Sequence, residues 1–181
     1  MALINYPGPR SPKIAAPFRS GDAMKNALRT GISFGLTSAV ITTLGLMTGL
    51  HSGTGSKNII IGGILTIAIA DAFSDALGIH VAEESKNIHT EKEVWTATAA
   101  TFLTKFLFSL TFVIPVIFLS LFAAMAVSLT WGFSVLAILS FFMAKSQGEP
   151  PWKIVGEHLL IAAIVIAITH WVGNGVALLN A

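Results

Sequence analysis

Cysteine is absent from this 181-residue chain, and charged residues are scarce. Without cysteine the chain has no disulfides, no thiolate metal sites and no redox-active thiol pairs. Charged side chains make up 11% of the sequence, whereas hydrophobic ones make up 54% and the mean hydropathy is +0.76. Soluble domains usually carry about 25% charged residues. The composition therefore predicts a polytopic membrane protein with no room for a separate soluble domain.

Several motifs of common enzymatic chemistry are also missing. The chain contains no Walker loop, no dinucleotide-binding fingerprint and no zinc-binding HExxH sequence. Its basic N-terminal segment is too short and too rich in proline to indicate more than generic nucleic-acid binding. We therefore expect neither an enzyme nor a nucleic-acid-binding protein.

The first thirty residues are basic and contain Pro7, Pro9, Pro12 and Pro17. They lack the apolar core of a signal peptide, so residues 1–30 are predicted to form a cytoplasmic tail. The rest of the chain, residues 31–181, is predicted to form a transmembrane domain.

Five apolar stretches are long enough to span a bilayer, for which a helix needs about 20 residues. The sequence thus predicts an all-α fold with five transmembrane helices, and Pro115 is expected to kink or end the third. Five basic residues precede the first span and four more lie in the loops on that side, against Lys57 alone on the other. This bias predicts a cytoplasmic N-terminus, and the compact chain fits a prokaryotic cell (inner) membrane. The predicted spans are about 31–50, 59–82, 95–119, 124–144 and 158–179.

Small residues form a stripe along the first span. Small side chains allow helix backbones to approach closely in lipid. We therefore expect this stripe to pack on the second span, on a second copy of the chain, or on both. Its members are Gly31, Gly35, Ser38, Thr42, Gly45 and Gly49.

Two aspartates, Asp71 and Asp75, lie near the middle of the second span. Each costs roughly 2.5–3.5 kcal/mol at the centre of a span. The eleven Ile, Leu, Val and Phe residues of Ile59–Val81 only about offset the combined cost of the two acids. Residues four apart share a helix face, so the carboxylates repel each other. The pair favours a shared proton or a bound cation, as in a transport pathway. The alternative is that both acids form packing hydrogen bonds with neighbouring helices.

The first span, GISFGLTSAVITTLGLMTGL, resembles that of the vacuolar iron transporter family, whose usual pattern is G-[LI]-x-[DS]-G-[LI]-V-T-T-[LF]-x-L-V-x-G-L. The segment Ala72–Gly78 resembles the family's A-x-S-M-A-x-G-E-Y pattern, and the last span, GEHLLIAAIVIAITHWVGNGVALL, resembles its fifth. The resemblance implies a homodimer with a pathway between the first two spans of both copies. It also implies export of Fe²⁺ or Mn²⁺ from the cytoplasm in exchange for protons, with no permanently bound cofactor.

The candidate metal site departs from this pattern. The family's first-span acid falls on Ser38, its methionine on Asp75 and its glutamate on Ile79, whereas Asp71 has no acidic counterpart. Oxygen ligands from Asp71, Asp75, Ser38 and Thr42 would favour Mn²⁺, Mg²⁺ or Ca²⁺, with Fe²⁺ still possible. The loop after the second span is too short for the family's cytoplasmic metal-binding domain, so the chain is expected to be a short, diverged member.

Other polar groups offer further candidates for the pathway. An acidic cluster after the second span either collects cations at the cytoplasmic mouth or is a solvated linker; it contains Glu83, Glu84, His89, Glu91 and Glu93. His80 is a weaker metal candidate and is expected to pair with Glu84. His170 and Asn174 either line the pathway or join helices through hydrogen bonds.

Lys105 is the one charged residue between Trp95 and Ala144. It either pairs with an acid or extends to the membrane surface. If it reaches Asp71 or Asp75, it neutralises them in place of a cation, which argues against metal transport.

We therefore hypothesise a divalent cation transporter for Fe²⁺ or Mn²⁺, driven by proton antiport. One alternative is a diverged membrane scaffold or interaction protein that no longer transports. A membrane enzyme or regulator is a third possibility, for which the sequence shows no catalytic constellation.

Overall fold

The computed structural model describes residues 20–179, which form six helices and no strand. The helices are α1 (Ser20–Thr54), α2 (Lys57–Ser85), α3 (Glu91–Thr111), α4 (Val113–Phe118), α5 (Leu121–Gln147) and α6 (Pro151–Leu179). With α3 and α4 taken together, the described chain has five helices long and apolar enough to cross a membrane. The all-α class and the five predicted spans are thereby confirmed at the level of length and composition.

The first and last helices extend beyond their predicted spans. α1 begins at Ser20, so the basic segment of residues 20–30, predicted as part of a tail, continues the helix; residues 1–19 of that tail lie outside the described range. α6 begins at Pro151. Proline is tolerated at the first position of a helix, because the N–H groups of the first turn have no partner within the helix. Hydropathy finds the apolar section of a helix, whereas backbone hydrogen bonding decides where the helix ends.

The third span is interrupted where proline predicts a kink. α3 ends at Thr111, and α4 begins after Phe112. Pro115 has no N–H to donate to the Thr111 carbonyl four residues back, and its ring crowds that carbonyl. A turn at Leu119 and Ser120 leads into α5, and the Lys57 ammonium donates a hydrogen bond to the Leu119 carbonyl.

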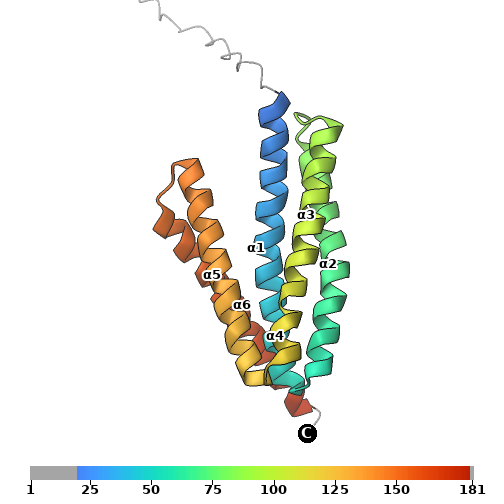
Figure 1. The fold of residues 1–181 in the computed structure, drawn as a ribbon, viewed down its shortest axis with the longest axis vertical. Helices are drawn as coiled ribbons and strands as arrows, with labels where there is room; N and C mark the ends of the chain where they lie inside the picture. The colour runs from blue at the N-terminus through green and yellow to red at the C-terminus, as the bar shows by residue number, and fades with distance from the viewer. Residues whose placement is uncertain (1–19, 180–181) are drawn as a thin grey trace, which may run out of the picture.

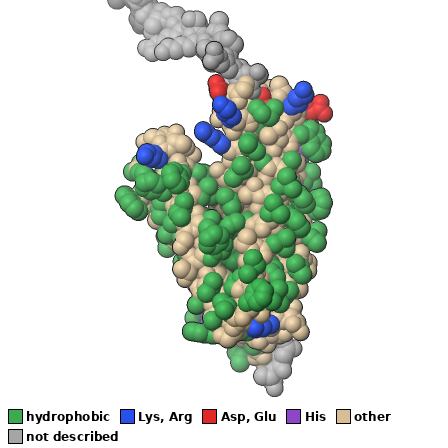
Figure 2. Space-filling view, in the orientation of Figure 1, with side chains coloured by type: hydrophobic (Ala, Val, Ile, Leu, Met, Phe, Trp, Pro, Cys, Tyr) green, Lys and Arg blue, Asp and Glu red, His purple; other side chains and the backbone are tan. Residues whose placement is uncertain are grey.

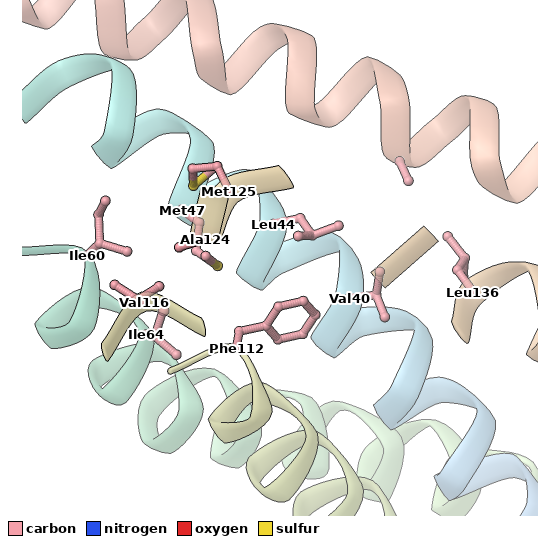
Figure 3. Close-up of a cluster of buried hydrophobic side chains, with 11 residues drawn as sticks. Val40, Leu44, Met47, Ile60, Ile64, Phe112, Val116, Ala124, Met125 and Leu136 are labelled. Atoms are coloured by element: carbon pink, nitrogen blue, oxygen red, sulfur yellow. The ribbon is translucent and has the colours of Figure 1, made fainter. Parts of the chain in front are cut away.

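α1 lies between the α2–α3 pair and α5 (Figure 1), and it contacts α2, α3, α5 and α6. Around its lower half in that view is the main apolar core, shown in Figure 3. Near the first residues of α1, the helices α5 and α6 diverge from α1. The core comprises Val40, Leu44, Met47, Ile60, Ile64, Phe112, Val116, Ala124, Met125, Leu136 and Ala162.

The glycine stripe of α1 packs on α3 and α6, so the prediction that it packs on the second span is wrong. A Cβ atom at Gly31 would lie 2.4 Å from the Ala97 carbonyl oxygen of α3. One at Gly49 would lie 3.3 Å from the Thr169 carbonyl oxygen of α6. A helical wheel identifies the face that permits close approach, but the neighbour is decided by which helix offers a matching small surface. Here α3 offers alanines and threonines.

Candidate functional site

A buried stripe on α3 faces the centre of the molecule. Thr101, Lys105 and Ser109 are spaced four residues apart, so they lie on one face of the helix, and all three are buried. The Thr101 hydroxyl donates to the Ala97 carbonyl 2.8 Å away and lies 3.4 Å from the Gly31 carbonyl of α1. The Thr43 hydroxyl of α1 donates to Ser109 Oγ at 3.2 Å. Because Gly31 and Gly35 have no side chains, the polar stripe of α3 packs directly against the backbone of α1.

Lys105 lies at the centre of the stripe and joins three helices. Its ammonium nitrogen is 2.5 Å from Asp71 Oδ2, 2.5 Å from Asp75 Oδ2 and 2.8 Å from Ser38 Oγ. A lysine ammonium has three N–H donors, so these contacts can use all of them. The sequence left two options for Lys105, and the structure shows the one in which it pairs with the acids, which is the outcome expected to argue against metal transport.

The carboxylates are more accessible than the lysine between them. The Lys105 side chain is 1% exposed, whereas those of Asp75 and Asp71 are 19% and 31% exposed. If all three groups are ionised, the site has a formal charge of −1. Three charges removed from water carry a desolvation cost that their attraction has to offset. The remaining negative charge leaves the site able to accept a proton or a cation from the exposed side.

Of the predicted metal ligands, the structure brings together Asp71, Asp75 and Ser38. The Thr42 hydroxyl donates to the Ser38 carbonyl at 2.9 Å, a bond within α1. His80 does not pair with Glu84 as predicted. Its Nδ1 lies 3.0 Å from Thr98 Oγ1, and its ring packs edge-on against Trp95, because that face of α2 lies against α3.

The predicted acidic cluster at the α2–α3 turn forms only in part. His89 Nε2 lies 3.1 Å from Glu83 Oε2, its Nδ1 lies 3.5 Å from Glu93 Oε2, and Lys86 pairs with Glu83 at 2.7 Å. The Glu93 carboxylate also accepts from the Thr90 N–H in the capping box of α3. Glu84 and Glu91 are exposed. Within residues 20–179, no group of three or more histidines and acids is arranged to hold a metal ion.

His170 and Asn174 contact each other on an exposed face of α6. Asn174 Nδ2 lies 3.1 Å from His170 Nε2, one helical turn away. A separate backbone contact, from Ser52 Oγ to the His170 carbonyl at 3.0 Å, joins α1 and α6. The two side chains therefore stand apart from the Lys105 site.

One motif in the sequence has the letters of a catalytic site without its structure. Gly31–Gly35 reads Gly-x-Ser-x-Gly, the pattern of a nucleophile elbow, in which the serine sits on a strained turn between a strand and a helix. Here the segment lies inside the continuous helix α1. Ser33 therefore lacks the setting that the motif requires.

No protein-family model matches the chain, and a search of curated proteins finds no match. The resemblance to vacuolar iron transporters therefore stays a prediction from sequence motifs.

Proposed function

We propose that this protein is a membrane transporter that exchanges a divalent cation, Fe²⁺ or Mn²⁺, for protons. The single observation that carries the proposal is that Asp71 and Asp75, although paired with the buried Lys105 ammonium, stay partly exposed. The pairing itself argues against metal transport unless Lys105 gives up its proton when a cation binds. Ionisable groups within a membrane span are rare and commonly mark ion or proton pathways. The motif resemblance to vacuolar iron transporters supplies the expected substrates and the direction, out of the cytoplasm.

Charge balance explains how a lysine fits such a site. With Lys105 charged and one aspartic acid protonated, the three groups sum to zero. With both carboxylates ionised, a divalent cation bound and Lys105 neutral, they again sum to zero. Passing from the first state to the second takes up one divalent cation and releases two protons, one from the acid and one from the ammonium. Both states avoid a net charge in the membrane, where net charge is costly.

The proposed site opens toward a surface that a second copy would cover. Asp71 and Asp75 are partly exposed at the side of α2, next to a row of exposed small residues that includes Ser74 and Gly78. A Cβ atom at Gly78 would meet no atom of the described residues within 4 Å. Small residues favour close helix packing in lipid. We therefore propose a homodimer through α2, in a prokaryotic cell membrane, with the N-terminus in the cytoplasm.

The second candidate is a non-transporting membrane scaffold, and the same contact favours it. Lys105 already neutralises one carboxylate and hydrogen-bonds to Ser38, as a structural link between α1, α2 and α3 would. In this case the ion pair holds the helices together and no cation replaces the ammonium. The two functions differ in whether the site releases protons from an aspartic acid and from Lys105 and binds a metal ion in their place.

Flux measurements distinguish the two functions. The full chain is reconstituted in liposomes, and uptake of Fe²⁺, Mn²⁺, Mg²⁺ and Ca²⁺ is measured under an imposed pH gradient. The Asp71→Asn/Asp75→Asn variant should lose transport while the matched control Ser74→Ala, exposed on the same helix, retains it. No flux of any ion from folded wild-type protein would refute transport and support the scaffold.

A further inference from the structure

A cleft separates the start of α1 from the end of α5 and the first turns of α6. α5 and α6 diverge from α1 there (Figure 1), and Figure 2 shows the hollow between them. The cleft has a volume of about 730 Å³, within the range typical of small-molecule sites. It is on the other side of α1 from the α2–α3 pair, so it is separate from the Lys105 site.

The polarity of the cleft changes along its length. Arg29 and Ser33 on α1 lie across from Gln147 on α5 at the mouth. Deeper in the cleft the walls include Phe34, five residues from Arg29, and Leu139, eight residues from Gln147. At 1.5 Å per residue these separations are about 7.5 Å and about 12 Å. Thr37 also lines the cleft, as does His158, whose Nδ1 lies 2.7 Å from Ser140 Oγ. A polar mouth above a mainly apolar interior matches the order of headgroup and acyl chain in a phospholipid.

The charge of the cleft selects among phospholipids. Among the described residues 20–179, Arg29 is the one lining residue with a permanent charge, and none of the lining residues is acidic. Among residues 20–179, Arg29 forms no ion pair. Lysine and arginine side chains lie on both sides of the hollow in Figure 2. Basic pockets between transmembrane helices commonly bind anionic headgroups, because guanidinium groups hydrogen-bond phosphate oxygens in pairs.

We infer that this cleft binds an anionic phospholipid, with its phosphate at Arg29 and an acyl chain along Phe34 and Leu139. The inference rests on the proposed membrane location but not on cation exchange. Its failure and that of transport are therefore separable, because lipid binding is measured without any ion gradient.

The test uses the full chain purified in detergent, delipidated, and titrated with phosphatidylglycerol or phosphatidylcholine while native mass spectrometry counts bound lipids. Arg29→Gln should weaken phosphatidylglycerol binding about fivefold, the factor that corresponds to about 1 kcal/mol for one basic residue. Lys25→Gln removes the same charge from the same end of α1 outside the cleft and should leave binding unchanged. Thr37→Phe, which fills the open cleft, should abolish it without lowering the unfolding temperature.

Four outcomes would overturn the inference. Equal binding of phosphatidylcholine would remove the role of charge. Equal weakening by Arg29→Gln and Lys25→Gln would indicate diffuse attraction to the surface. Unchanged phosphatidylglycerol binding in Thr37→Phe, or its full displacement by inorganic phosphate, would show that no acyl chain occupies the cleft.

Discussion

Replacing Lys105 with methionine removes the charge at the centre of the site while retaining most of the side-chain volume. In the wild type, its ammonium contacts Asp71, Asp75 and Ser38. In Lys105→Met, the two carboxylates face each other one turn apart with no cation between them. They then have to share a proton, reach water or bind an added cation.

The size of the effect follows from the burial of the site. Removing one partner from a buried ion pair costs about 3–5 kcal/mol. Because Asp71 and Asp75 lie one turn apart, they can share a proton, which reduces the penalty of leaving them without the ammonium. We therefore expect a loss at the lower end, about 3 kcal/mol. For a chain of this length, that corresponds to a fall in Tm of about 6–12 °C.

Thermal unfolding of the full chain in detergent measures this loss. Two further measurements identify its cause. Adding Asp71→Asn and Asp75→Asn to Lys105→Met should restore much of the stability, because neutral amides need no countercharge. Added Mn²⁺ should raise the Tm of Lys105→Met more than that of the wild type, in which the ammonium competes for the same oxygens.

An unchanged Tm in Lys105→Met would refute the ion-pair reasoning. A lowered Tm that Asp71→Asn/Asp75→Asn does not recover would attribute the loss to packing of the lysine stem. Destabilisation with no response to Mn²⁺, Fe²⁺, Mg²⁺ or Ca²⁺ in either protein would leave the ion pair as a structural link and favour the scaffold.

Three further predictions concern helix packing and assembly. Gly31→Leu should lower stability by about 1–3 kcal/mol in the same unfolding assay, because its Cβ would meet the α3 backbone. Gly62→Leu should not, because a Cβ there has no atom of residues 20–179 within 4 Å; equal effects would contradict the close α1–α3 contact. Thr90→Ala should cost about 1 kcal/mol by removing the capping box of α3, and Thr90→Ser should retain that stability; equal losses would contradict capping. Gly78→Phe should disrupt the proposed dimer in light-scattering measurements while Gly156→Phe on α6 does not, and an intact Gly78→Phe dimer would place the interface elsewhere.

The sequence predicted those features that depend on local chemistry. Hydropathy identified five spans, Pro115 identified the break in the third, and helical spacing put Asp71 and Asp75 on one face. The partner of the glycine stripe and the orientation of His80 were not predictable in this way. They depend on which helices are neighbours, and periodicity within one helix does not contain that information.

A signal for the Lys105 contact was nevertheless present. α2 and α3 form a helical hairpin, and Asp71 and Lys105 are each 17 residues from Ile88, which lies in the turn between them. Antiparallel helices rise equally per residue, so equal separation from the turn places both side chains at the same depth. Opposite charges at one depth in an apolar hairpin are strongly driven to pair, since neither has water as an alternative partner.

The exposure pattern of the three groups bears on which of the two functions the pair performs. An ion pair that only links helices needs no access from outside the bundle, whereas a site that exchanges ions does. Here only the lysine is enclosed, at 1% exposure, while the carboxylates extend to the side of α2. A cation arriving from that side meets the carboxylates first and does not have to pass the ammonium. The lysine can then yield its partners without leaving the α1–α3 interface, which is the arrangement that exchange requires.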